Sequence, residues 1–419
     1  MTTLCALYFA QGIPWGFMTI ALVSYLNSRH ISEEITGELT ALVLLPWTFK
    51  LIWAPLIDSV SFRSMGRRRA WIIGAELMMA FTLLGILALG DLTQDLKLLG
   101  WMFFLHNCFA SLQDVCTDAL AVDVLPFKEQ GAANGLMWGS KLIAKGGGAA
   151  AMAWVMSEWG IPAAVLLQFV MLLLIMLFPL LILERPGEKR FPWSSGAAVR
   201  AESESEKRNP MIILRDLVKG FSLRATFFFA IFTVIKLVAS GVNEIVTKSL
   251  YIQQLDWNYV DFSTVAGIYT IGPVLLGAFG GGFLSNRVGR RPVIVSGFVG
   301  YALCCFVFAA NPDLWDQRWF TVSYLMATEG LIAMGSVGFL SMAMRITWTT
   351  SSATMFTVYM TLSNIGHVVG NKIVGTVRAE LSYEQTFFYV GIASILPLLL
   401  LPLVDPVSVD KAKSLDAGE

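Results

Sequence analysis

Two acidic residues one helical turn apart interrupt one apolar stretch of the sequence, and two lysines one turn apart interrupt the next. The acids are Asp114 and Asp118, and the lysines are Lys141 and Lys145. Ionisable groups inside a membrane are costly, so they usually face a cavity or one another. The acids therefore indicate either a site for a proton or a cationic group, or a structural ion pair with the lysines. The lysines could instead meet a carboxylate or phosphate of a solute.

The two acids end a longer polar stripe that begins with Asn107 and Ser111. The four residues are spaced four, three and four apart. At about 100° per residue, this spacing places them on one narrow face of a helix. We therefore expect the helix to turn this face toward a polar interior rather than toward lipid.

Other apolar stretches carry isolated polar residues that could serve the same site. We predict that lysines and amides contact a polar solute and that a tryptophan stacks on one of its rings. The predicted solute-binding residues are Gln11, Trp15, Lys141, Lys145, Lys236, Asn243, Asn364 and Asn371. Asp114, Asp118 and Glu244 are the predicted proton-coupling residues, with a satisfied helix–helix contact as the alternative for Glu244.

The remaining reactive residue types do not cluster. The histidines, His30, His106 and His367, lie on different segments, and the five cysteines have no metal-ligand or disulfide-framework spacing. We therefore expect no metal, no cofactor and no enzymatic activity. A membrane-embedded enzyme or a sensor stays as the alternative class, and it would need a catalytic cluster or a soluble output domain.

The composition indicates a membrane protein. Of 419 residues, 56% are apolar and only 14% are charged, which leaves too few polar side chains to cover a soluble surface. The lipid bilayer is therefore an expected partner. The net charge is zero, so the composition does not suggest nucleic acid as a partner.

The apolar stretches predict twelve transmembrane helices, because about 20 apolar residues cross the hydrocarbon. The predicted fold is an all-α membrane protein of two six-helix bundles. The first six spans are 4–26, 37–56, 70–90, 98–122, 131–156 and 161–183. The second six are 223–250, 262–284, 292–310, 319–344, 352–374 and 387–404. The predicted domains are residues 1–184, a cytoplasmic linker 185–221, residues 222–405 and a cytoplasmic tail 406–419.

Lysine and arginine are concentrated in alternate loops, which predicts the orientation. If both termini are cytoplasmic, the outer loops keep only Arg29, Lys97, Arg318 and Arg378. We therefore predict a multi-pass protein of the inner (plasma) membrane with both termini in the cytoplasm.

A charged loop occurs twice, as APLIDSVSFRSMGRRR at residues 54–69 and as GGFLSNRVGRR at residues 281–291. Both copies resemble the signature loop of the major facilitator superfamily, which implies two related six-helix halves that alternate access to a central site. The resemblance suggests a gating latch formed by Asp58, Arg67, Arg68 and Arg290. Simple positive-inside anchoring by the arginines is the alternative. Ala54 and Asn286 depart from the signature.

Three further stretches give a closer resemblance: QGIPWG at 11–16, LPWTFKLIWAPLID at 45–58 and LQDVCTDA at 112–119. They are similar to AmpG-type muropeptide permeases, acetyl-CoA transporters and related siderophore permeases. The matching residues are Lys50, Trp53, Pro55, Asp58, Gln113, Asp114 and Asp118. The resemblance implies a secondary transporter for a muropeptide-like solute, with a siderophore or acyl-CoA as alternatives. We expect proton symport by a monomer.

Overall fold

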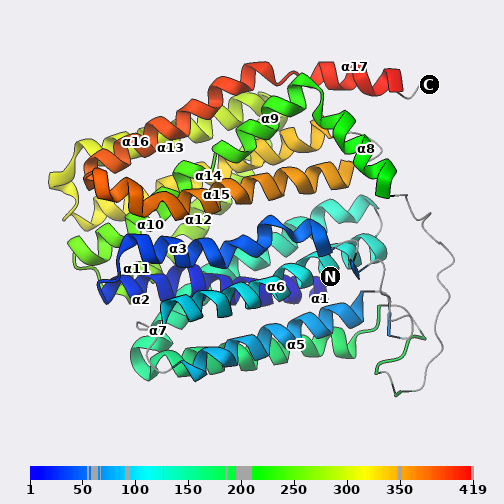
Figure 1. The fold of residues 1–419 in the computed structure, drawn as a ribbon, viewed down its shortest axis with the longest axis horizontal. Coiled ribbons are helices and arrows are strands. Elements are labelled where there is room, and N and C mark those ends of the chain that lie inside the picture. The colour runs from blue at the N-terminus through cyan, green and yellow to red at the C-terminus, as the bar shows by residue number, and fades with distance from the viewer. Residues whose placement is uncertain are drawn as a thin grey trace. The chain divides into compact units, whose positions relative to one another are not determined.

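The structure is a computed structural model. It describes residues 1–53, 56–57, 65–66, 68–89, 95–125, 127–184, 187–191, 193–194, 210–347 and 352–416. The elements formed by these residues are all helices, and no strand occurs among them (Figure 1). The chain divides into two compact units. Unit 1 holds residues 1–203 and 256–268, and unit 2 holds residues 204–255 and 269–419. The domain bounds drawn from the sequence stay a prediction.

Unit 1 contains the first six predicted spans. Its elements are α1 (Thr2–Gly16), η1 (Phe17–Ala21), α2 (Leu22–Ser28), α3 (Glu33–Leu44), η2 (Leu45–Thr48), η3 (Lys50–Ile52), α5 (Arg69–Gly85), η4 (Ile86–Ala88), α6 (Leu96–Val124), α7 (Phe127–Leu181) and α11 (Tyr259–Thr264). The π-helical η6 (Val265–Tyr269) continues α11 into unit 2.

Unit 2 contains the other spans, except residues 262–268 of the eighth span, which belong to unit 1. Its elements are α8 (Pro210–Phe221), α9 (Arg224–Ile235), α10 (Val238–Ser249), η5 (Leu250–Gln254), α12 (Thr270–Arg287), α13 (Arg290–Ala310), η7 (Pro312–Leu314), α14 (Arg318–Ile346), α15 (Ser352–Glu380), α16 (Tyr383–Ile395), η8 (Leu396–Leu403) and α17 (Pro406–Asp416).

The predicted set of twelve membrane-spanning helices is confirmed. In the part of the chain that the structure describes, nine stretches are long and apolar enough to cross a membrane. One of them, Gly135–Leu181, contains two predicted spans, because Gly160 takes a non-helical backbone with φ of 81° and ψ of 171°. The other two predicted spans are α6 and α15, which are 29 residues long but too polar to meet the same test.

Proline shapes the two helices that carry the predicted motif residues near the N-terminus. Pro14 lies inside α1, and a π-helical turn, η1, follows three residues later. Proline lacks an N–H group, so it cannot complete the helical ladder. In the second span Pro46 is the second residue of the 3-10 segment η2, and η3 then carries Lys50. The break turns the residues that follow α3 out of the regular helical register.

Helices in each unit pack closely where the chain has glycine. In unit 1, α1 packs along α7, and a methyl group at Gly16 would overlap the carbonyl oxygen of Lys145. In unit 2, α10 packs on α15, where a side chain at Gly241 would meet the backbone of His367 and Gly370. Small residues allow such backbone contact between membrane helices.

The two copies of the charged loop share one backbone feature. Gly66 and Gly289 have φ values of 96° and 95°, in the region that favours glycine. Each glycine lies just before a long helix, α5 in unit 1 and α13 in unit 2. The shared conformation supports the interpretation of the sequence as two related halves.

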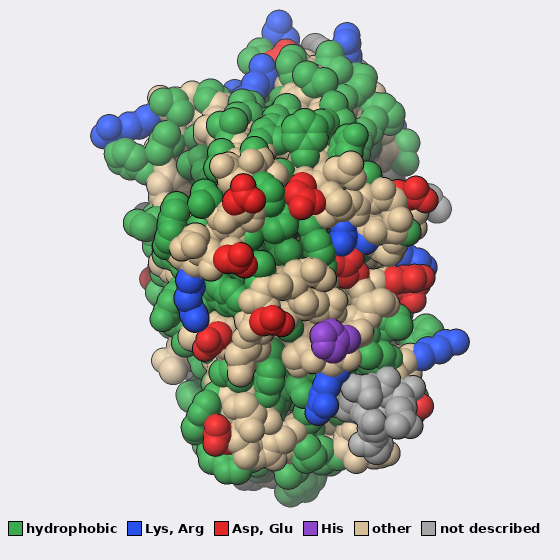
Figure 2. Space-filling view, turned by 90° about the vertical axis from the view of Figure 1, so that its left-hand side faces the viewer, with side chains coloured by type: hydrophobic (Ala, Val, Ile, Leu, Met, Phe, Trp, Pro, Cys, Tyr) green, Lys and Arg blue, Asp and Glu red, His purple; other side chains and the backbone are tan. Residues whose placement is uncertain are grey.

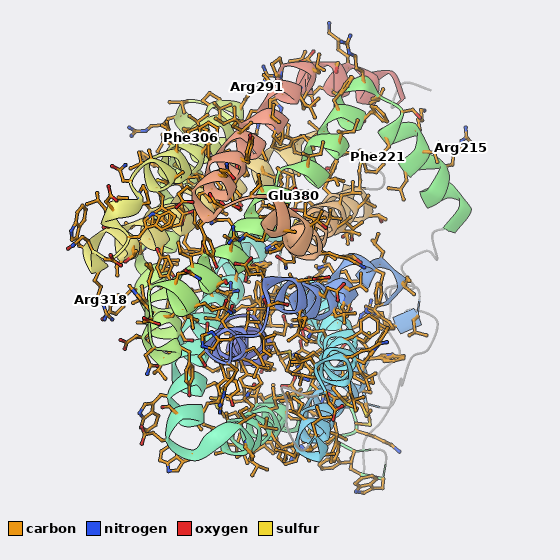
Figure 3. All side chains as sticks on the ribbon, turned by 60° about the vertical axis from the view of Figure 1, so that its left-hand side comes forward. Arg215, Phe221, Arg291, Phe306, Arg318 and Glu380 are labelled. Carbon is orange, nitrogen blue, oxygen red and sulfur yellow. The ribbon has the colours of Figure 1, made fainter. Side chains whose placement is uncertain are left out.

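Charged residues also lie at the ends of helices. Figure 2 faces one end of the molecule and shows Asp and Glu side chains on that surface. In unit 2, Arg291 lies at one end of α13, while Arg318 begins α14 near the other end of α13 (Figure 3). Arg291 donates to the carbonyl oxygen of Val404 at 2.7 Å, which ties the start of α13 to the end of η8.

Candidate functional site

Each of the four residues of the predicted polar stripe on α6 forms a hydrogen bond or an ion pair with another side chain of unit 1. Trp47 Nε1 donates to Asn107 Oδ1 at 3.3 Å, and Trp53 Nε1 donates to Ser111 Oγ at 2.8 Å. One turn further on, Lys50 Nζ lies 3.2 Å from Asp114 Oδ2. The last member, Asp118, accepts a hydrogen bond from the hydroxyl of Tyr8. The helical spacing therefore identified one continuous polar face.

Asp114 lies between two lysines. Lys141 Nζ is 3.4 Å from Asp114 Oδ1, and Lys50 approaches the other oxygen. The side chains of Asp114 and Lys141 are only 5% and 3% exposed. The ion pair of Asp114 with Lys141, which the sequence left as an alternative, is present. Lys50, to which the sequence analysis gave no role in the site, is its second cation.

Four aromatic rings surround the ammonium group of Lys141. Its Nζ lies 4.4 Å from the ring centre of Trp47, 5.2 Å from Trp138, 5.4 Å from Tyr8 and 5.5 Å from Trp15. Rings at such distances stabilise a cation through their quadrupoles. The cage and Asp114 together compensate the charge of a lysine that is almost fully removed from water.

Lys145 lies outside this ion pair. Its Nζ is 4.7 Å from the ring centre of Trp15, one helical turn along α7 from Lys141. The predicted Trp15 therefore contacts both lysines, so its ring is not free to stack on a solute without leaving them.

A second polar layer lies behind the cage. Gln11 on α1 accepts from Lys141 Nζ at 2.6 Å and donates to Gln113 Oε1. Gln113 on α6 donates through Nε2 to Leu7 O at 3.2 Å and to Glu76 Oε2 on α5 at 3.0 Å. The sequence predicted Gln11 as a solute contact and did not assign Glu76 to any site. The only sequence signal for Glu76 was an acid in an otherwise apolar span.

The predicted polar residues of unit 2 are engaged differently. Lys236, in the turn between α9 and α10, is 3% exposed. Its Nζ donates to Ser363 Oγ at 2.9 Å and lies 4.0 Å from the ring centre of Phe339. Among the described residues, no carboxylate oxygen lies within 4.0 Å of its Nζ. Asn243 accepts from the hydroxyl of Tyr324 at 2.7 Å.

Glu244 lies in a small charged group of its own. Its carboxylate is 2.7 Å from Lys248 Nζ and 2.9 Å from His367 Nε2, and it is 24% exposed. The contact with His367 joins α10 to α15, so the helix–helix interpretation of Glu244 is present in the structure. Asn364 lies on α15 and is also engaged by neighbouring residues.

The side-chain amide of Asn371 is buried without a described hydrogen-bond partner. It is 0% exposed, and neither Oδ1 nor Nδ2 has a hydrogen-bond partner among the described residues. An unpaired buried amide costs about 1–3 kcal/mol, which a ligand could recover.

The structure describes half of the predicted gating residues. Arg68 Nε lies 3.3 Å from Asp123 Oδ2 in unit 1, and Arg290 Nε donates to Ser341 Oγ at 2.8 Å in unit 2. Asp58 and Arg67 lie outside the described residues. The sequence missed Arg69, which is 2% exposed and donates to carbonyl oxygens of Pro179, Leu180 and Arg190. It therefore ties the start of α5 to the end of α7.

Comparison with known proteins decides the family. The family model described as Major Facilitator Superfamily matches residues 4–244 and 245–418. The chain belongs to the major facilitator superfamily. Members of this superfamily are secondary transporters, so this chain is a multi-pass membrane transporter of small solutes.

Relatives within the superfamily agree with the motif resemblance. The chain is 25% identical to the anhydromuropeptide permease of Escherichia coli (strain K12), over 96% of this chain and 78% of that protein. It is 23% identical to an uncharacterized protein of Haemophilus influenzae, over 97% and 94%. The resemblance to AmpG-type permeases is confirmed.

Solved structures share the fold at low sequence identity. A POT family transporter bound to a thioalcohol-conjugated peptide has a TM-score of 0.70 at 13% identity, covering 96% of this chain and 95% of that chain. The nucleoside transporter NupG also has a TM-score of 0.70 at 13% identity, covering 96% and 99%. The predicted major facilitator fold is confirmed.

Proposed function

We propose that this superfamily member is a proton-coupled symporter for a polar, partly anionic organic solute of the muropeptide class. It would work by alternating access in the inner membrane, as a monomer with both termini in the cytoplasm. The similarity to an anhydromuropeptide permease over 96% of the chain supports this solute class. The two-unit organisation supports movement of one half against the other.

The observation that best supports an anionic solute is the set of contacts made by the buried Lys236. A buried ammonium group is costly unless an anion compensates it. The described partners of Lys236 are a hydroxyl and a phenyl ring, so its charge lacks an anionic partner within the described part of the chain. A carboxylate of the solute would supply that partner. Asn243, Asn364 and the unpaired amide of Asn371 would supply hydrogen bonds.

Unit 1 would recognise the solute through its charged cluster. Lys141, Lys145, Gln11 and Trp15 would exchange their present partners for groups of the solute. Asp118 is the better proton acceptor of the two stripe acids, because its described partner is the neutral hydroxyl of Tyr8. Asp114 lies between two ammonium groups, which favours its charged form. Glu244 would be the proton-coupling acid of unit 2.

Uptake by proteoliposomes tests this proposal. The probes are an anhydromuropeptide, a ferric siderophore and acetyl-CoA, each with and without an inwardly directed proton gradient. We expect gradient-dependent uptake of the anhydromuropeptide, reduced at least tenfold in Asp118→Asn. Uptake of another probe would reassign the solute class. Uptake that is independent of the proton gradient in both the wild type and Asp118→Asn would rule out proton coupling. The absence of flux of any probe would favour the enzyme or sensor class.

A further inference from the structure

Glu76 is a buried acid of α5 with one described hydrogen bond. It lies in the middle of α5 and is 0% exposed. Oε2 accepts one hydrogen bond, from Gln113 Nε2 at 3.0 Å, and Oε1 has no partner among the described residues. A carboxylate with one amide donor and no cation is costly in hydrocarbon, so a neutral, protonated carboxyl fits this environment.

The ionisable groups on helices around Glu76 have other partners. α5 packs against α6 and α7, and α1 packs against both of these helices. His106 on α6 contacts the carbonyl oxygen of Met79 and the hydroxyl of Thr82. The other groups and their partners are Asp114 with Lys50 and Lys141, Asp118 with Tyr8, Lys141 with Gln11, and Arg69 with carbonyl oxygens near the end of α7. The one described side-chain partner of Glu76 is thus a neutral amide.

That amide begins a chain of hydrogen bonds with a fixed direction. Gln113 uses its Nε2 for Glu76 and Leu7, so its Oε1 is turned to Gln11 Nε2. Gln11 consequently presents its Oε1 to Lys141 Nζ, at 2.6 Å. The donor end of the chain therefore meets an acid, and its acceptor end meets the caged ammonium group. Displacement of Lys141 would release Gln11 and then Gln113.

We propose that Glu76 is a second proton-binding site, coupled to the Lys141 cage through Gln113 and Gln11. Glu76 carries a proton while Lys141 occupies the cage. The hydrogen bond from Gln113 favours the charged form of Glu76. When a solute displaces Lys141, the two amides reorient, and Glu76 loses this bond and holds its proton more tightly. Return of Lys141 to the cage after delivery restores the bond and favours release of the proton on the side to which the solute was delivered. One proton is taken up and one is released in each cycle. This inference rests on the proposed proton-coupled transport.

Infrared spectroscopy tests the proton without any solute. Purified wild-type protein at neutral pH should show the C=O stretching band of a protonated carboxyl, with a shift in D2O. Glu76→Gln keeps an acceptor for Gln113 and should lose this band. Glu76→Asp keeps an acid and should retain a band. Asp410→Asn, at an exposed ion pair with Arg345 in unit 2, should leave the band unchanged. A wild-type band that persists in Glu76→Gln overturns the proposal.

Transport tests the coupling. In proteoliposomes with an anhydromuropeptide, Glu76→Gln should lower gradient-driven accumulation at least tenfold, while exchange of labelled for unlabelled solute falls much less. Normal accumulation in Glu76→Gln would contradict the proposed coupling between the Glu76 proton and solute transport. Gln113→Leu should keep the infrared band and lose accumulation. If wild-type protein moves no probe but the band depends on Glu76, the transport proposal fails and the proton site stands.

Discussion

The polar interiors of the two units differ in how their charges are compensated. In unit 1, Asp114 is shared by Lys50 and Lys141, and four aromatic rings surround Lys141. In unit 2, Lys236 has a hydroxyl and a ring as partners, and the amide of Asn371 is unpaired among the described residues. Unit 1 thus has the features of a preassembled structural core. Unit 2 has the features of a site that is completed by a ligand.

The largest expected effect is the loss of the carboxylate at the centre of unit 1. Asp114→Ala leaves Lys50 and Lys141 buried without their anion, which should lower the free energy of unfolding by about 3–5 kcal/mol. Titration of the micelle-embedded protein with a denaturing detergent measures this. Lys145→Ala is the matched control, because Lys145 contacts Trp15 outside the ion pair. Equal effects of the two substitutions would contradict a special role for the Asp114 cluster.

The aromatic cage should contribute less than the carboxylate. Trp47→Leu removes the ring closest to Lys141 and the hydrogen bond to Asn107. We expect a loss of about 2–3 kcal/mol in the free energy of unfolding, from one partly buried cation–π contact and one neutral hydrogen bond. Trp154→Leu, at a ring that is 51% exposed, is the control and should change stability little in the same titration. A Trp47 variant as stable as this control would show that the cage does not stabilise Lys141.

The charged group of unit 2 should contribute less again. Glu244→Gln weakens contacts with Lys248 and His367, but the carboxylate is 24% exposed and one contact is between residues one helical turn apart. Such pairs contribute roughly 0.5 kcal/mol. A loss several times larger would mean that unit 2 has a compensated core like that of unit 1.

The smallest effect on stability should come from Lys236→Met. Replacing a buried ammonium that lacks an anionic partner among the described residues by an apolar chain of similar volume should leave the free energy of unfolding nearly unchanged, because such replacements are often neutral. Anhydromuropeptide uptake should nevertheless fall at least tenfold. Lys141→Met, by contrast, should lower both stability and uptake. If Lys236→Met destabilises the protein as much as Lys141→Met, the contrast between the units is wrong.

Much of the fold could be predicted because membrane helices leave a strong pattern in the sequence. Length and hydropathy located the twelve spans, and the four-residue stripe on α6 identified the polar face from Asn107 to Asp118. The break of α7 lies at Gly160, between two predicted spans.

The partners of these residues depend on details that periodicity does not contain. Lys50 reaches Asp114 from the 3-10 segment η3, outside regular helical spacing. Glu76 lies on a span that looked almost wholly apolar, and Gln113 is a single amide that gives no periodic signal. The cage around Lys141 combines rings from α1, η2 and α7, which only the packing of three segments brings together.

The polarity of α6 and α15 has a consequence for biosynthesis. Translocon insertion penalises Asp, Lys and Arg at the centre of a span by about 2.5–3.5 kcal/mol each, so α6, with Asp114 and Asp118, is a poor substrate for independent insertion. It can enter the bilayer cheaply only beside α1 and α7, which supply Tyr8 and Lys141. We therefore expect α6 to leave the insertion machinery only together with the helices that supply its ion-pair and hydrogen-bond partners.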